Sequence, residues 1–233
     1  MIKRKFLTIL LLCLVAVSAF SQSENYGTWI GISGEKKLNK WEVSAETELR
    51  TIYFLRLIDR WSIGAALDYS ILKQLKIGVG YQLMNSLDYD ADYVKDYFIR
   101  NRLNASATGK LKWNDFSFSL RQRIQVTFKE ERMQTDGTID DYKMNPAWAW
   151  RNRLQVEYNI PNCKITPSAS VETFYDLNNP DGNSFENIRS VLSLDYKLNK
   201  KNHVELYGVI NSELHSDDAD GKYILGLSYK HTF

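Results

Sequence analysis

Three Arg-x-Arg pairs lie in separate segments of the chain, and each pair runs into alternating apolar and polar residues. The pairs are Arg100 with Arg102, Arg121 with Arg123, and Arg151 with Arg153. Guanidinium groups bind carboxylates and phosphates through charge-assisted hydrogen bonds. Six of them on one surface could bind anions, or they could pair with acidic side chains of the fold.

Acidic residues occur at alternating positions of similar segments, so ion pairing is the first alternative. These acids are Glu42, Glu46, Glu48, Asp68, Glu157, Glu172, Asp195 and Glu205. They are numerous enough to pair with the arginines, and buried charges are normally paired. The segments therefore favour a structural ion-pair core over an anion-selective pore, and both alternatives stay open at this point.

Residue types used in hydrolysis stand together at His215, Ser216 and Asp217. Neighbours in a loop seldom face each other, and a catalytic triad is defined by geometry rather than by proximity in sequence. We therefore assign no catalytic residue. The sequence favours a protein that is not an enzyme over a surface hydrolase of lipid or glycan.

Two patterns could hold a metal ion, and both fail. The stretch 218–221 resembles the middle of a calcium loop, but Ser216 and Leu227 occupy the first and last ligand positions of that pattern. The three histidines have no metal-ligand spacing. We expect no metal and no cofactor.

Alternation with a period of two places the charged residues on β-strands. In Trp41–Arg50 the odd positions are apolar or Thr and the even positions are polar or charged, as in a strand with one wet and one apolar face. The same pattern predicts strands near 61–69, 75–83, 97–108, 115–128, 147–158, 164–175, 187–197, 203–212 and 222–233.

The connections between these strands alternate in length. Short turns are expected at 36–40, 72–74, 109–112, 159–162 and 198–201, and longer loops around 85–95, 129–145, 176–186 and 213–221. Strands of about 9–11 residues joined in this way are typical of a transmembrane barrel, with short periplasmic turns and longer extracellular loops. The expected fold is therefore all-β, an antiparallel transmembrane β-barrel of about 10–12 strands.

The barrel predicts where the charged residues point. An arginine that faces lipid would cost roughly 2–4 kcal/mol at the bilayer midplane. A soluble barrel would instead put aromatic residues such as Trp41 and Tyr229 into a dry interior. We therefore expect a lumen lined by Arg100, Arg102, Arg121, Arg123, Arg151, Arg153, Arg189, Glu46, Glu48, Glu157 and Glu172.

The same phase puts three amides, Asn101, Gln122 and Asn152, on the lipid face. If Arg102 lies opposite Arg121, a cross-strand pair between Asn101 and Gln122 would satisfy both side chains. A bulge, a position near the headgroups and a subunit contact are the alternatives.

Counting the strands raises a question of parity. With Tyr26–Gly34 as a strand the count is eleven, whereas bacterial single-chain barrels normally have even numbers. The first segment could lie in the lumen or pair at an edge, which gives ten strands, or a strand is missing from the count, which gives twelve. Ten is the slightly preferred number.

The N-terminal segment indicates export. Residues 1–21 have a basic start, an apolar run and small residues before Ser21, as in a cleaved secretory signal peptide, and 22–233 form the expected barrel domain. Removal of Lys3, Arg4 and Lys5 changes the formal charge from +2 to −1, which gives no support for a nucleic-acid partner. Cys163 then remains as a single cysteine, so no intrachain disulfide can form.

The last strand ends in Phe233, with Tyr229 four residues earlier and Gly226 before that. This ending resembles the C-terminal signal by which outer-membrane barrels are recognised by their assembly machinery.

The order of several short stretches resembles one protein family. The stretches are Gly27-Thr28-Trp29, Leu49-Arg50 with Asp59-Arg60-Trp61, Gly78-Val79-Gly80-Tyr81, Arg151-Asn152-Arg153-Leu154 with Glu157-Tyr158, and Ile224-Leu225-Gly226. Together they are similar to outer-membrane barrels of Bacteroidota that are catalogued as domain of unknown function 2490. The resemblance implies a barrel and carries over no catalytic residue.

From the sequence we therefore expect a monomeric barrel in the outer membrane of a Gram-negative bacterium. Its partners would be lipid and lipopolysaccharide, and the barrel assembly machinery during biogenesis. Its expected role is a structural barrel or a narrow, low-conductance, porin-like channel. The alternatives are a surface hydrolase and a barrel that binds a partner through its loops.

Overall fold

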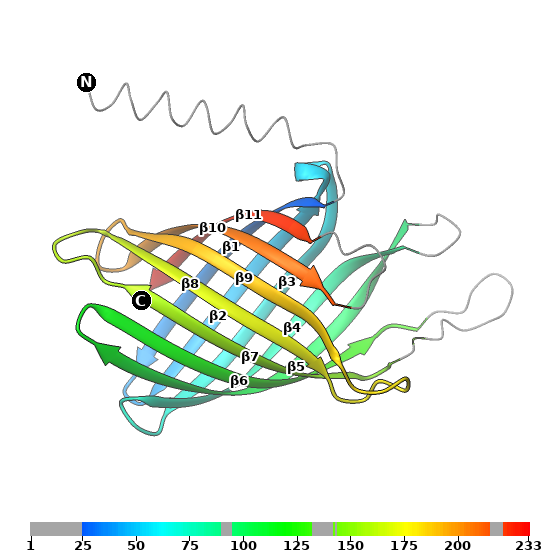
Figure 1. The fold of residues 1–233 in the computed structure, drawn as a ribbon, viewed down its shortest axis with the longest axis horizontal. Coiled ribbons are helices and arrows are strands. Elements are labelled where there is room, and N and C mark those ends of the chain that lie inside the picture. Colours follow the sequence, from blue (N-terminus) through cyan, green and yellow to red (C-terminus); the bar gives the residue numbers. More distant parts are fainter. Residues whose placement is uncertain (1–24, 90–94, 132–141, 143, 215–220) are drawn as a thin grey trace, which may run out of the picture.

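Eleven β-strands close into one barrel in the computed structural model, which describes residues 25–89, 95–131, 142, 144–214 and 221–233 (Figure 1). The strands are β1 (Tyr26–Leu38), β2 (Trp41–Ile52), β3 (Leu57–Ser70), β4 (Leu75–Tyr89), β5 (Lys95–Trp113), β6 (Phe116–Lys129), β7 (Ala147–Tyr158), β8 (Ile165–Asp176), β9 (Phe185–Lys197), β10 (Asn202–Glu213) and β11 (Lys222–Thr232), with a 3₁₀ turn η1 (Tyr53–Leu55) after β2. The all-β barrel expected from the alternation is confirmed. Among these residues no helix is long and apolar enough to cross a membrane.

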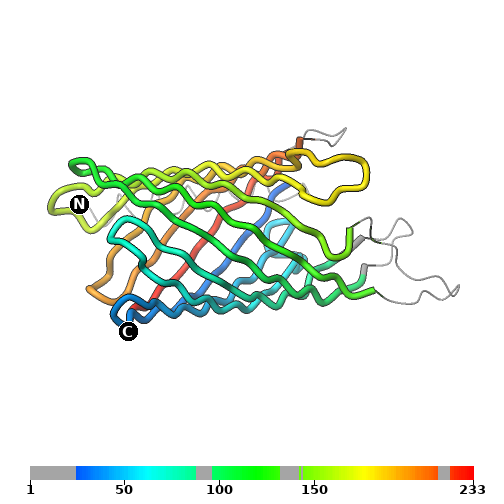
Figure 2. Tube along the Cα trace, turned by 90° about the horizontal axis from the view of Figure 1, so that it is seen from below, coloured from blue at the N-terminus to red at the C-terminus, as the bar shows by residue number. Residues whose placement is uncertain are grey.

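The strands are inclined to the long axis of the barrel, and the connections gather at its two ends (Figure 2). One end, here called the short-turn end, holds the connections after β1, β3, β5, β7 and β9. The other, the long-loop end, holds the connections after β2, β4, β6, β8 and β10. A side chain's depth in the barrel can therefore be read from its distance to either end of its strand.

The strand number lies within the expected range, but the preferred number of ten is wrong. β1 belongs to the wall, antiparallel to β2 and parallel to β11, with pairs from Tyr26↔Tyr223 to Glu35↔Thr232. Unpaired strand edges are not tolerated in lipid, and the parallel pairing satisfies both edges without a twelfth strand. The wall is thus antiparallel everywhere except at this β1–β11 seam.

The short turn expected at 109–112 is also wrong. β5 continues to Trp113, and the hairpin turns at Asn114 and Asp115 instead. Asn114 has a φ of 52°, the left-handed conformation that two-residue hairpin loops require and that Asn adopts readily. Strand lengths run from 11 residues in β11 to 19 in β5, so several strands are longer than the expected 9–11.

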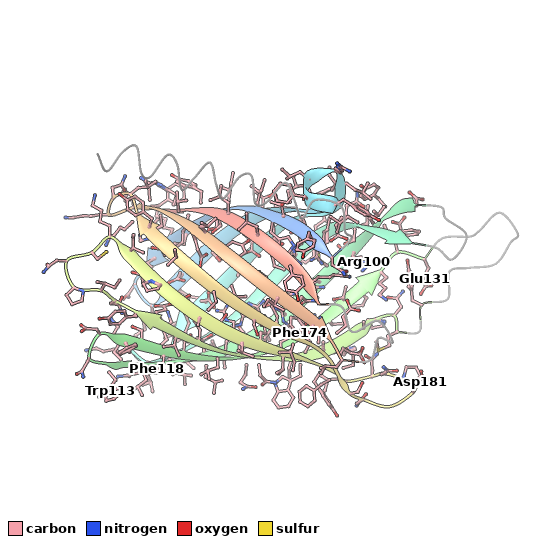
Figure 3. All side chains as sticks on the ribbon, turned by 45° about the horizontal axis from the view of Figure 1, so that its top comes forward. Arg100, Trp113, Phe118, Glu131, Phe174 and Asp181 are labelled. Carbon is pink, nitrogen blue, oxygen red and sulfur yellow. The ribbon has the colours of Figure 1, made fainter. Side chains whose placement is uncertain are left out.

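The two faces of the wall separate apolar from charged side chains. On β6, β7 and β9 the outer face carries Ile124, Leu154 and Leu192, which are exposed. Alternate positions of the same strands carry arginines that line the interior. Side chains therefore project on both sides of the sheet (Figure 3), and the apolar side is the outer one, as a membrane barrel requires.

Gly226 on β11 permits a close approach to Tyr207, which lies directly opposite on β10. A Cβ atom at Gly226 would overlap the ring of Tyr207. We therefore expect Gly226→Ala to lower the free energy of unfolding by about 1–3 kcal/mol, as overpacking usually does. Urea unfolding of the refolded protein measures this.

Gly208→Ala is the matched control for that experiment, since a Cβ at Gly208 meets nothing within 4 Å. Its unfolding midpoint should move little. Equal losses in the two variants would show that strand propensity, and not the contact with Tyr207, limits this position.

Candidate functional site

The lumen contains a cavity of about 530 Å³ whose lining is dominated by arginine. The charged residues of the lining are Arg50, Arg60, Arg102, Arg121, Arg123, Arg151, Arg153, Arg189, Glu46, Glu48, Glu172 and Glu205. Eight arginines against four glutamates leave an excess of four formal positive charges. Small polar residues complete the lining, among them Ser168, Ser170, Ser193 and Ser228. The cavity is therefore hydrophilic and electropositive.

Most side chains that the sequence assigned to the lumen lie on this cavity, but two do not. Arg100 lies nearer the long-loop end of β5, opposite Met84 of β4 (Figure 3). Glu157 lies near the short-turn end of β7, where it accepts a hydrogen bond from Gln155 at 3.0 Å. Sequence reasoning did not place Arg50 in the lumen, although Arg50 has the same parity as Glu46 and Glu48 on β2. Arg60 has the parity of Ser62 and Asp68 on β3, but it lies one residue before the strand predicted at 61–69.

Four arginines form a square array on the paired strands β6 and β7. Arg121 lies opposite Arg153, and Arg123 lies opposite Arg151. Like charges directly opposite each other destabilise a sheet. The array therefore needs a counter-charge to be stable.

Glu172 of β8 supplies that counter-charge. Its two carboxylate oxygens accept hydrogen bonds from Arg121 at 2.6 Å and from Arg151 at 2.7 Å, and the residue is 5% exposed. Arg151 also donates to Gln125 at 3.0 Å. One buried carboxylate thus bridges a guanidinium group of β6 and a guanidinium group of β7.

The other arginines of the array have no such partner. Within the described part of the chain, Arg123 and Arg153 form no ion pair with an acid, and their Nε atoms are buried without a hydrogen-bond partner. Arg102, on the neighbouring strand β5, bonds to the hydroxyl of Thr127 at 3.0 Å and likewise lacks a carboxylate. None of these three guanidinium groups is paired with a described carboxylate.

The acids expected to pair with the arginines are distributed differently along the barrel. Near the short-turn end, Lys76 pairs with Glu42 at 2.9 Å and with Asp68 at 3.4 Å. His203 and Asp195 lie 2.9 Å apart at the same end. Depth therefore separates these three acids from the arginines, which contributes to the positive excess around the cavity.

Arginines and aromatic rings form a stack toward the long-loop end. Arg50 lies 3.6 Å from the ring centre of Trp29, Arg189 lies between Trp29 and Phe174 at 5.1 and 4.8 Å, and Arg151 lies 4.4 Å from Phe174. Cation–π contacts of this kind add to the ion pairs of Arg50 and Arg151 and stabilise Arg189, which has no described carboxylate partner. We call these five residues the guanidinium–aromatic stack.

The lumen is closely packed around this stack. Met84 and Val209, in the parts of β4 and β10 nearer the long-loop end, are 1% and 2% exposed, and Ile224 of β11 is buried as well. Buried apolar side chains thus gather in the half of the lumen nearer the long-loop end, and the cavity serines lie in the other half.

Two of the three amides on the lipid face have a partner for their carbonyl oxygen, although not the one expected from sequence, whereas the buried Oδ1 of Asn152 has none among the described residues. Arg102 lies opposite Thr127 rather than Arg121, because the hairpin turns at 114–115 rather than at 109–112. Asn101 instead accepts a hydrogen bond from the Tyr81 hydroxyl at 2.6 Å, and Gln122 accepts one from the Trp150 indole at 2.8 Å. The Asn152 amide donates to Thr173 at 3.5 Å.

The last residues of the chain lie on the β1–β11 seam. The Phe233 amide donates to the carbonyl of Glu35 at 3.0 Å, and its ring lies against Gly34. The Tyr229 hydroxyl donates to Asn202 at 2.6 Å. The C-terminal pattern that resembles an assembly signal thus also contributes contacts to barrel closure.

Some predicted features fall outside the described residues. These are the segment 1–21 and the residues His215, Ser216 and Asp217. Within the described ranges, no group of three His, Cys, Asp or Glu side chains could hold a metal ion. Cys163 is exposed as a free thiol between β7 and β8.

Comparison with known proteins supports the architecture. A family model described as "Protein of unknown function (DUF2490)" matches residues 26–221, while no match was found among curated proteins. A solved structure of the NanC porin has a TM-score of 0.50 and 12% identity, covering 85% of this chain and 87% of the porin. The β domain of the Bordetella autotransporter Brka has a TM-score of 0.51 and 9% identity, with coverage of 85% and 86%. Identities this low show the fold alone.

Proposed function

Because the chain belongs to the DUF2490 family, whose description assigns no activity, we propose its function from the lumen: a narrow, anion-selective channel across the outer membrane. The excess of arginines over glutamates around the cavity carries this proposal. The likeness to a porin and to an autotransporter β domain supports the outer-membrane location. In the proposed orientation the short turns face the periplasm and the long loops face outward, as in other barrels of this kind.

Charge would select ions at the array on β6 and β7. Rings of arginine or lysine favour anions in a pore, because they replace part of the lost hydration with fixed positive charge. Arg123 and Arg153 are the best placed, since neither forms an ion pair with a described acid and both line the cavity. The guanidinium–aromatic stack, which lies toward the long-loop end, would keep the conductance low.

Single-channel recording of the refolded protein in a planar bilayer, under a salt gradient, tests this function. The reversal potential of the native protein should show a preference for chloride over potassium. Arg123→Ala and Arg153→Ala should each reduce that preference, because each removes an unpaired positive charge from the pore.

Arg56→Ala is the matched control, because Arg56 follows η1 outside the lumen and is exposed. It removes the same formal charge and should leave the selectivity unchanged. A native preference for cations would contradict the proposal. If bilayers that contain the native protein show no conductance and only the lumen variants leak, the arginines are the core of a closed barrel.

A further inference from the structure

Opposite charges face each other across the cavity without meeting, and we propose that they bind a small dipolar organic molecule that carries both an anionic group and an ammonium group. Arg123 and Arg153 would hold the anionic group, and Glu46 would hold the ammonium group. The inference deepens the proposed function, since it concerns the same cavity, but the site can exist whether or not the barrel conducts ions.

The order of strands places these charges on opposite walls. β2, which carries Glu46, is separated from β6 by β3, β4 and β5, and from β7 on the other side by β1, β11, β10, β9 and β8. In a closed ring of eleven strands this is close to the largest possible separation. β2 accordingly lies on the fainter rear wall behind β7 (Figure 1).

Glu46 is the one acid of the cavity lining without a described partner, since even Glu205, which has no described ion pair, accepts a hydrogen bond from Ser228 at 3.4 Å. Glu48 pairs with Arg50, Glu172 with Arg121 and Arg151, and Glu42 with Lys76. Among the described residues Glu46 has no hydrogen bond or ion pair, and it is exposed to the cavity that it lines. Its carboxylate lies over Gly64 of β3 and is exposed to the cavity.

The free charges share one cavity but do not neutralise each other. Glu46, Arg123 and Arg153 all line it, yet no ion pair within 4.0 Å joins the described carboxylate to either guanidinium group. Unpaired charges in a narrow, partly desolvated interior are unfavourable unless something compensates them. A molecule with one charge of each sign would compensate both walls at once.

A simple anion would satisfy only half of this arrangement. Its charge would be attracted by the arginines but repelled by Glu46, whereas an ammonium group near Glu46 adds a second attraction. The serines of the lining, on β8, β9, β11 and β1, supply hydrogen-bonding groups on the strands that connect the two walls. The cavity of about 530 Å³ has the size of a site for a small organic molecule.

Isothermal titration of the refolded barrel in detergent micelles tests the site without requiring conductance. The probes are 4-aminobutyrate and butyrate, which have the same chain length and carboxylate and differ by the ammonium group. The native protein should bind 4-aminobutyrate at least about tenfold more tightly than butyrate. Glu46→Gln should abolish this difference, and Arg123→Gln should weaken the binding of both probes.

Glu42→Gln is the matched control, because Glu42 lies on the same strand and is already paired with Lys76. It should leave the preference for 4-aminobutyrate intact. The inference is overturned if butyrate binds as tightly as 4-aminobutyrate to the native protein, or if neither probe binds. The chloride preference in bilayers is measured separately, so either proposal can fail while the other stands.

Discussion

Replacement of Glu172 by alanine is expected to destabilise the barrel by about 3–5 kcal/mol, the usual result of removing one partner from a buried ion pair. The loss has two parts. Arg121 and Arg151 lose their only described carboxylate, and the four arginines of the array are left to repel one another across β6 and β7. A folded barrel changes its mobility in gel electrophoresis when it is boiled. The fraction of protein in the folded band, measured at increasing urea concentrations, gives the unfolding midpoint.

Glu205→Ala is the control for this variant, because Glu205 also lines the cavity but makes a single hydrogen bond of 3.4 Å, from Ser228. It should cost much less stability. If the two variants unfold at the same urea concentration, the carboxylate bridge is not what holds the array together. Glu172→Ala should also increase the chloride preference of the channel, since it removes a negative charge beside the pore.

Replacement of Phe174 by alanine is expected to widen the proposed channel, with a rise in single-channel conductance of about twofold or more, because constrictions of packed side chains limit the conductance of narrow pores. The Phe174 ring is in contact with two guanidinium groups, Arg151 and Arg189. Without this ring the guanidinium–aromatic stack loses the side chain that contacts both Arg151 and Arg189. The lumen should then widen in the half nearer the long-loop end. Recording native and variant channels under identical salt conditions measures the change.

Phe118→Ala provides the comparison, since Phe118 lies on the outer face of β6, away from the lumen (Figure 3). It removes an aromatic ring of the same size and should leave the conductance unchanged. An unchanged conductance in Phe174→Ala would place the constriction elsewhere in the barrel.

The fold could be predicted from the sequence because membrane and lumen impose opposite requirements on alternate residues. A strand such as Trp41–Arg50 has to put Val43 outward and Glu46 inward, so the period of two predicts both the strand and its phase. The register between β5 and β6 was harder to predict, because it depends on the position of the turn that joins them. The Lys110–Lys112 segment has the composition of a turn, although it continues β5 to Trp113.

The pairing of charges could not be predicted from the sequence, because it depends on depth and on strand order. Glu42 and Glu46 are both acidic and both face inward, yet Lys76 engages only the first. The sequence supplies the parity of each residue but not its height relative to residues on distant strands. The separation of Glu46 from Arg123 across the lumen became visible only with the barrel closed.

The seam between β1 and β11 places the start of β1 and the end of β11 at opposite ends of the barrel. Because these strands run parallel, β1 begins at the long-loop end, whereas β11 finishes at the short-turn end. A peptide fused ahead of Tyr26 and one fused behind Phe233 would therefore emerge on opposite sides of a membrane. An odd number of strands thus makes this barrel a scaffold that can present one fusion to each compartment, which an even-stranded barrel with both termini on one side cannot do.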